Sequence, residues 1–112
     1  MLRCEAVRWI GYDPLPGLVE VAFTDAAGTR RSFVDKVPIF DDADRIQPDG
    51  SFPVAVYVDC EVLATDNQNG REVVTITTQR PWGLETQEGL SEFQVLPQQI
   101  VRDEPPTPAP FP

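Results

Sequence analysis

The sequence contains no histidine and a single lysine, Lys36, among its 112 residues. Without an imidazole, the chain has no histidine base to activate a serine or cysteine nucleophile and no histidine ligand for zinc. Eighteen acidic side chains stand against nine basic ones, which gives a net charge of −9 at pH 7. This charge disfavours nucleic acid as a partner, because binding to phosphates is driven by lysine and arginine side chains that release counterions.

Cysteine is also scarce, since Cys4 and Cys60 are the two cysteines of the chain. Two thiols are too few for a disulfide-stabilised scaffold or for a four-thiolate metal site. Both lie in apolar runs that are typical of strands, so we expect reduced, buried thiols that pack as small hydrophobic side chains. A disulfide bridge that joins two strands is the alternative.

Long hydrophobic runs are absent, because no apolar stretch approaches the roughly 20 residues that span a bilayer. Residues 1–5 lack the apolar core of a secretion signal, so we predict a soluble, cytoplasmic protein without a membrane partner. The sequence also has no G-x-S-x-G, no glycine-rich phosphate loop, no C-x-x-C and no lysine cluster. We therefore predict that the chain is not an enzyme and has no cofactor.

The dominant pattern in the sequence is an alternation of apolar and polar residues, which is typical of half-buried strands. The clearest strand is predicted at residues 53–64. One face would carry every second residue from Val54 to Ala64, and the other would carry Tyr57, Asp59 and Glu61. The first face is predicted to be the core, because a slip by one residue would bury the two carboxylates.

Turn residues between alternating runs predict two hairpins. The strand at residues 53–64 would turn at 66–70, where Asn69-Gly70 accepts a positive φ, and return along residues 71–78. The second hairpin would pair residues 17–24 with 30–35 around a turn at 25–28. The remaining predicted strands are residues 4–10, where imperfect alternation indicates a bulge or burial on both faces, and residues 92–96.

Five or six short antiparallel strands predict an all-β fold. The expected form is a small barrel or sandwich, with an open OB-like or SH3-like barrel preferred. Residues 1–102 would form a single domain. Residues 103–112 include five prolines and are predicted to be an extended, polyproline-type tail.

Acidic residues gather in the irregular stretch 37–51, which prolines interrupt and in which residues 41–46 could form one helical turn. Asp41, Asp42, Asp44 and Asp49 offer the oxygen ligands that calcium accepts, but their spacing does not match a calcium-binding loop. We therefore expect a solvated acidic loop and no metal site.

Tyr57 and Trp82 are the aromatic side chains that we single out for contact with a partner. Tyr57 shares the predicted outward face with Asp59 and Glu61, two carboxylates without the apolar surroundings of a catalytic acid–base pair. Trp82 lies in a Pro-Trp-Gly turn, where a tryptophan often closes one end of a small core. We expect a lid on the core, with an exposed binding anchor as the alternative.

Segments 33–38 (FVDKVP) and 81–85 (PWGLE) resemble those of small uncharacterised bacterial β proteins. This resemblance implies an all-β body, does not extend to the proline-rich tail, and carries no activity or catalytic residues. As a small acidic β domain without catalytic motifs, the chain is also similar in character to bacterial immunity proteins. That likeness implies that its partner would be a toxin.

Charge sign and the missing catalytic groups predict a non-enzymatic interaction module that binds a basic partner protein, in its sharpest version an immunity protein. Residues 41–66 hold seven acidic side chains and one basic one, a net charge of −6. Two alternatives stay open: an assembly subunit that docks through its proline-rich tail, and a β-barrel that binds a small ligand or calcium. The predicted contact residues are Asp41, Asp42, Asp44, Asp59, Glu61, Tyr57 and Trp82.

Overall fold

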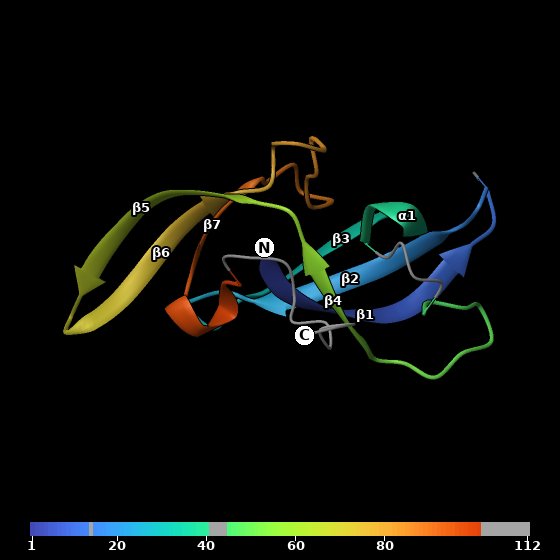
Figure 1. Cartoon of the computed structure of the whole chain (residues 1–112), viewed down its shortest axis with the longest axis horizontal. Coiled ribbons are helices and arrows are strands. Elements are labelled where there is room, and N and C mark those ends of the chain that lie inside the picture. The colour runs from blue at the N-terminus through green and yellow to red at the C-terminus, as the bar shows by residue number, and fades with distance from the viewer. Residues whose placement is uncertain (14, 41–44, 102–112) are drawn as a thin grey trace, which may run out of the picture.

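The computed structural model describes residues 1–13, 15–40 and 45–101, which form two antiparallel β-sheets (Figure 1). Sheet A has the spatial order β3-β2-β1-β4, and sheet B has the order β5-β6-β7. The strands of sheet A are β1 (Leu2–Gly11), β2 (Leu18–Thr24), β3 (Arg30–Lys36) and β4 (Val54–Val58). Those of sheet B are β5 (Glu61–Gln68), β6 (Arg71–Thr77) and β7 (Glu92–Val95). The helical turn α1 (Val37–Phe40) follows β3, and the 3-10 turn η1 (Pro97–Gln99) follows β7.

The predicted all-β class is confirmed, but the predicted barrel is not found. In the part of the chain that the structure describes, no strand of sheet A pairs with a strand of sheet B. The same part contains no helix with the length and apolar character that crossing a membrane requires. The predicted tail at residues 103–112 and the acidic residues Asp41, Asp42 and Asp44 lie outside the described residues.

The hydrophobic core lies between the inner face of sheet A and the base of sheet B. Phe23 and Phe33 of sheet A contact Phe93 of sheet B, with ring centroids 5.1 Å and 5.9 Å from that of Phe93. Both contacts are edge-to-face, the arrangement that aromatic quadrupoles favour. The buried residues packed around this cluster come from both sheets and include Leu2, Val19, Val21, Val56, Val58, Val74, Ile76 and Val95.

The predicted pairing of residues 17–24 with 30–35 is confirmed, as β2 with β3. The other predicted hairpin is confirmed in part, because β6 pairs with residues 61–68, whereas residues 54–58 of the predicted strand belong to sheet A. Asn69 and Gly70 turn the β5–β6 hairpin with φ values of 54° and 79°, the left-handed pair that a two-residue turn needs. The predicted bulge in β1 is confirmed by register shifts on either side of Arg8 and Trp9. The last strand is confirmed as β7, whereas the described helical turn, α1, comes before the predicted position at residues 41–46.

The prediction of one continuous strand at residues 53–64 is wrong. β4 ends at Val58 in sheet A, and after Asp59 and Cys60 the chain enters sheet B as β5. Val58 is buried as expected, but Val62, predicted for the same core face, is 43% exposed. The alternation runs through the break, so the pattern does not reveal that the second half has left the core.

The turn between β2 and β3 links the two sheets. The Ala26 amide donates to the Gln94 carbonyl at the outer edge of β7, 2.8 Å away. The Arg71 guanidinium of β6 donates to the Ala26 carbonyl at 2.6 Å. β5 and β6 extend together to one side of the molecule, as Figure 1 shows, with Arg71 beside the turn that joins them. We call this pair of strands the β5–β6 arm.

Candidate interaction surface

The connection between β6 and β7 presents Trp82 to solvent. The Gly83 amide donates to the Gln79 carbonyl at 2.7 Å, and Gly83 has a φ of 63°, so the chain turns tightly at this point. Trp82 is 54% exposed, and its indole Nε1 donates to Asp59 Oδ2 at 2.9 Å. The expectation that Trp82 is a lid on the core is therefore wrong, and the exposed alternative describes its position.

The core is closed at this end by Leu84 and Thr78 instead of Trp82. Leu84 is 1% exposed, and Thr78 is completely buried. The Thr78 hydroxyl donates to the Leu84 carbonyl at 2.7 Å, which satisfies both polar groups inside the protein. Because the chain turns tightly at Gly83, Leu84 packs into the core while Trp82 stays exposed on the surface.

Glu61 lies at the start of β5 and is paired with a cation. The Arg80 guanidinium donates Nε to Glu61 Oε2 at 2.5 Å and Nη2 to Oε1 at 3.2 Å. This two-bond contact with Arg80 lowers the pKa of Glu61 from its ordinary value, because it favours the ionised carboxylate. Glu61 therefore stays charged over a wider acidic range, but part of its charge is balanced by Arg80.

Tyr57 does not share a face with Glu61, contrary to the sequence-based expectation. Tyr57 belongs to β4 and lies opposite Arg3 on the neighbouring strand of sheet A. Glu61 belongs to β5 in sheet B and lies opposite Thr77. The break between Val58 and Glu61 thus divides the predicted surface. Asp59, Glu61 and Trp82 lie at one site, joined by the Trp82–Asp59 hydrogen bond, whereas Tyr57 lies on the other sheet.

Sheet B also carries acidic residues that the sequence analysis did not single out. Thr77 pairs with Glu61 on one side and with Glu92 on the other, which places both carboxylates in one row across the sheet. Asp66 and Glu72 are exposed farther along the arm. Residues 59–101 hold seven acidic side chains against two basic ones, whereas residues 1–40 hold five of each. Counting charge by segment would have found this division without a structure.

Three large apolar side chains are exposed at the base of the arm. Val62, Leu63 and Trp82 are 43%, 47% and 54% exposed. Leu63 is an extra residue in β5, because Val62 pairs with Ile76 and Ala64 pairs with Thr75. This β-bulge explains why an apolar side chain lies outside the regular ladder.

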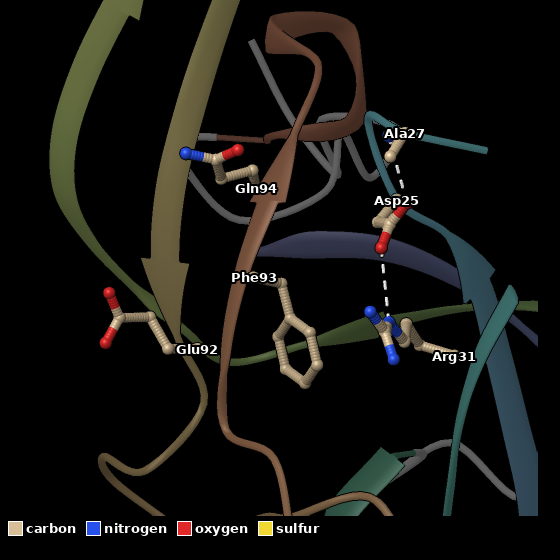
Figure 2. A pocket seen from close by; sticks show the side chains of 6 residues that line it. All are labelled: Asp25, Ala27, Arg31, Glu92, Phe93 and Gln94. Atoms are coloured by element: carbon tan, nitrogen blue, oxygen red, sulfur yellow. Dashed lines mark hydrogen bonds and ion pairs between the residues drawn. The ribbon is translucent and has the colours of Figure 1, made fainter. Parts of the chain in front are cut away.

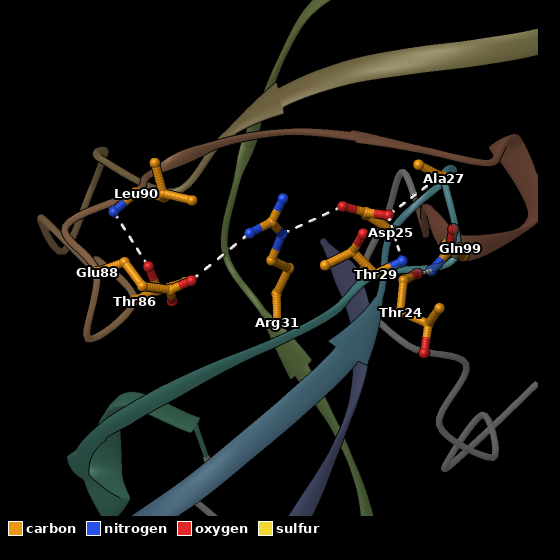
Figure 3. A network of polar contacts seen from close by, with 9 residues as sticks. All are labelled: Thr24, Asp25, Ala27, Thr29, Arg31, Thr86, Glu88, Leu90 and Gln99. Carbon is orange, nitrogen blue, oxygen red and sulfur yellow. Dashed lines mark hydrogen bonds and ion pairs between the residues drawn. The ribbon is translucent and has the colours of Figure 1, made fainter.

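A pocket of about 280 Å³ lies between the β2–β3 turn and β7, and Figure 2 shows its lining. Two of its polar side chains, Arg31 and Asp25, already bond to each other. Arg31 Nε donates to Asp25 Oδ2 at 3.1 Å, and Arg31 Nη1 lies 3.6 Å from Glu88 Oε2 (Figure 3). The other Asp25 oxygen accepts the amides of Ala27 and Thr29. These contacts hold the β2–β3 turn in place, and the Arg31 guanidinium lies between the carboxylates of Asp25 and Glu88. We therefore assign a structural role to this network.

Cys4 and Cys60 are both free thiols. Cys4 is buried, as expected, and its burial strongly raises the pKa of the thiol. Cys60 is half-buried, and burial raises the pKa of its thiol as well. Both groups are therefore protonated near neutral pH, which makes them poor nucleophiles and poor metal ligands.

Among the described residues, no group of three or more histidine, cysteine, aspartate or glutamate side chains is gathered as a metal site. Comparison with protein-family models found no match to this sequence. Comparisons with curated proteins and with solved structures also found no match. The resemblance of segments 33–38 and 81–85 to bacterial β proteins stays a prediction.

Proposed function

We propose that the protein is a non-enzymatic interaction module whose β5–β6 arm and its base bind a basic partner protein. The observation that carries this proposal is the joint location of charge and exposed apolar surface. The segment 59–101 has a net charge of −5, and Val62, Leu63 and Trp82 are exposed within it. Unlike charges would speed the encounter, and burial of the three apolar side chains would then hold the complex.

The sharpest version of this function is an immunity protein that neutralises a basic, nuclease-type toxin. Charge sign supports this version, because a protein that binds nucleic acid carries a basic surface. Asp59 and Trp82 support it as well, since an exposed tryptophan held in place by a hydrogen bond is a rigid anchor for a partner. Asp41, Asp42 and Asp44 enter the proposal through their charge alone.

The test compares two double variants that change the net charge equally at different places. Asp66→Asn with Glu72→Gln removes two charges from the arm, and Glu5→Gln with Asp13→Asn removes two exposed charges from sheet A and the turn that follows β1. The probe is cytochrome c, a basic globular protein, and the measurement is its association rate at low and high salt.

We expect the arm variant to slow association by about threefold to tenfold at low salt, with a smaller effect at high salt, because steering depends on local charge. The control variant should change the rate by less than about twofold, since its charges lie in the neutral half. Equal effects of the two variants would contradict the proposal, because charge would then act without a defined surface. Association rates that do not depend on salt would also contradict it.

A further inference from the structure

We infer that the partner binds by strand addition: an extended, basic segment pairs with the free edge of β5 and extends sheet B. This inference rests on the proposed function in one respect, namely that the partner is basic. It goes beyond that function because it names the bonds, the strand and the conformation of the bound segment. Strand addition is a recurring mode of recognition in which backbone hydrogen bonds give affinity.

The two edges of sheet B differ in the part of the chain that the structure describes. The edge at β7 is covered, because the Gln94 carbonyl accepts the Ala26 amide of the β2–β3 turn. The edge at β5 pairs with no described strand, and all eight residues of β5 are exposed. Figure 1 shows the arm extending to one side, with no other described strand along the edge at β5.

The register identifies the backbone groups that face this open edge. Gln68 and Arg71 flank the two-residue turn and so form a hydrogen-bonded pair. Hydrogen-bonded and non-hydrogen-bonded pairs alternate along an antiparallel ladder, so Asn67 and Thr65 form non-hydrogen-bonded pairs with β6. Their N–H and C=O groups therefore point away from β6. An added strand would gain two donors and two acceptors there.

β5 has few of the features that usually prevent an edge strand from pairing with another chain. The strand contains no proline and no lysine, and the bulge at Leu63 disturbs only its first part. The regular stretch runs from Ala64 to Gln68, which is long enough for a short added strand. Exposed apolar side chains lie at the bulged end of β5, where they can contact the part of the partner that continues beyond the added strand. They are Val62, Leu63 and Trp82.

Charge selects a basic segment over a second copy of this chain. β5 carries Glu61 and Asp66 and no basic residue, and Glu72 follows directly on the neighbouring strand. A second copy would bring the same carboxylates to the same edge, and each copy has a net charge of −9. Lysine or arginine at alternate positions of an added strand would instead lie on the same face as Asp66.

The probe is an eight-residue peptide of alternating lysine and threonine with blocked ends. Its twin carries N-methyl groups on the residues whose amides would bond to β5, which removes those donors without changing the charge. Binding to the isotope-labelled full chain is followed by NMR, and protection of the Thr65 and Asn67 amides from hydrogen exchange is measured. The protein variants are Thr65→Pro, which removes an outward donor, and Thr65→Ala, which removes only the side chain beyond Cβ.

We expect the unmodified peptide to shift and protect the Thr65 and Asn67 amides most strongly. N-methylation and Thr65→Pro should each weaken binding about tenfold, because each removes one or two backbone hydrogen bonds, whereas Thr65→Ala should stay within about twofold. Proline is tolerated on an edge strand where its nitrogen faces outward. If Thr65→Pro does not fold, the comparison of the two peptides decides the question by itself.

Different results would contradict strand addition and the proposed binding of a basic partner. Equal binding of both peptides, or protection elsewhere, would overturn strand addition and leave an acidic surface that binds basic chains. Absence of binding by both peptides and by cytochrome c at low salt would overturn the proposed function. Sedimentation of the protein alone provides a third result: a dimer that Thr65→Pro converts to a monomer would identify a second copy as the occupant and overturn the basic segment.

Discussion

Sheet A and strand β5 of the arm share the same alternation of apolar and polar residues, but they bury it differently. In β2, Val19, Val21 and Phe23 are buried in the core, whereas every residue of β5 is exposed. Charge also differs along the chain, since residues 1–40 are neutral and residues 59–101, which include the arm, carry −5. Alternation therefore specifies a strand, whereas burial requires a second layer of structure to cover one of its faces.

The largest difference in stability is expected between two truncated side chains, one in sheet A and one in β5. Phe33→Ala removes a completely buried ring from sheet A and should lower the free energy of unfolding by about 3–5 kcal/mol. Leu63→Ala shortens a side chain that is 47% exposed on β5 and should cost less than about 1 kcal/mol. Urea denaturation measures both values. Similar losses would show that the arm contributes to the core as much as sheet A does.

A second prediction concerns Gly17, which ends the connection before β2. Gly17 has a φ of 136°, and a Cβ atom there would lie 2.2 Å from Cζ2 of Trp9. Gly17→Ala should therefore lower the free energy of unfolding by about 2–4 kcal/mol, from backbone strain and steric overlap together.

Gly28 provides the matched control for Gly17. It has a φ of 85°, but a Cβ atom there would meet nothing within 4 Å. Gly28→Ala should cost about 1 kcal/mol, the strain of the backbone alone. The difference between the two variants, measured by thermal denaturation, isolates the contact with Trp9. If the two losses were the same, Trp9 would have moved aside without cost.

These two regions also show how much the sequence could predict. The hairpin turns were predictable because Asn69-Gly70 and the turn at residues 25–28 carry local chemistry that determines backbone angles. The break between β4 and β5 was not, because Asp59 and Cys60 continue the alternation while the hydrogen-bonding partner changes. Pairing partners depend on residues far away in the sequence, which a local pattern does not contain.

The candidate surface was predictable in composition but not in arrangement. Asp59, Glu61 and Trp82 were chosen for charge and aromatic character, and the structure places them at one junction. Their pairing with neighbours was not foreseen, since the contact between Glu61 and Arg80 spans nineteen positions of sequence. The exposure of Trp82 follows from the tight turn at Gly83, which determines which of the two apolar residues beside it enters the core.

A third prediction sharpens the contrast at the junction of core and surface. Thr78→Val keeps the shape of a buried side chain but removes the hydroxyl that donates to the Leu84 carbonyl. The free energy of unfolding should fall by about 1–2 kcal/mol, because a buried acceptor loses its partner. Thr65→Val on the exposed arm is the control and should change stability by less than about 0.5 kcal/mol. An equal change at both positions would mean that water reaches the Leu84 carbonyl.

The smallest effect is expected at Glu61, whose pKa the contact with Arg80 lowers from its ordinary value. Because the pKa is lower in the folded protein, the pair stabilises the fold above the ordinary pKa, and this contribution is lost as pH falls through the lowered value. The pair is exposed and screened by salt, so the change in stability should be slight. Arg80→Gln should return the pKa of Glu61 toward its ordinary value, which an NMR titration of the Glu61 carboxyl carbon measures. Arg71→Gln, on the same sheet but bonded to the Ala26 carbonyl, should leave the Glu61 titration unchanged. If both variants shifted the titration equally, the general field of the acidic sheet would control Glu61, and the local pair would have no separate effect.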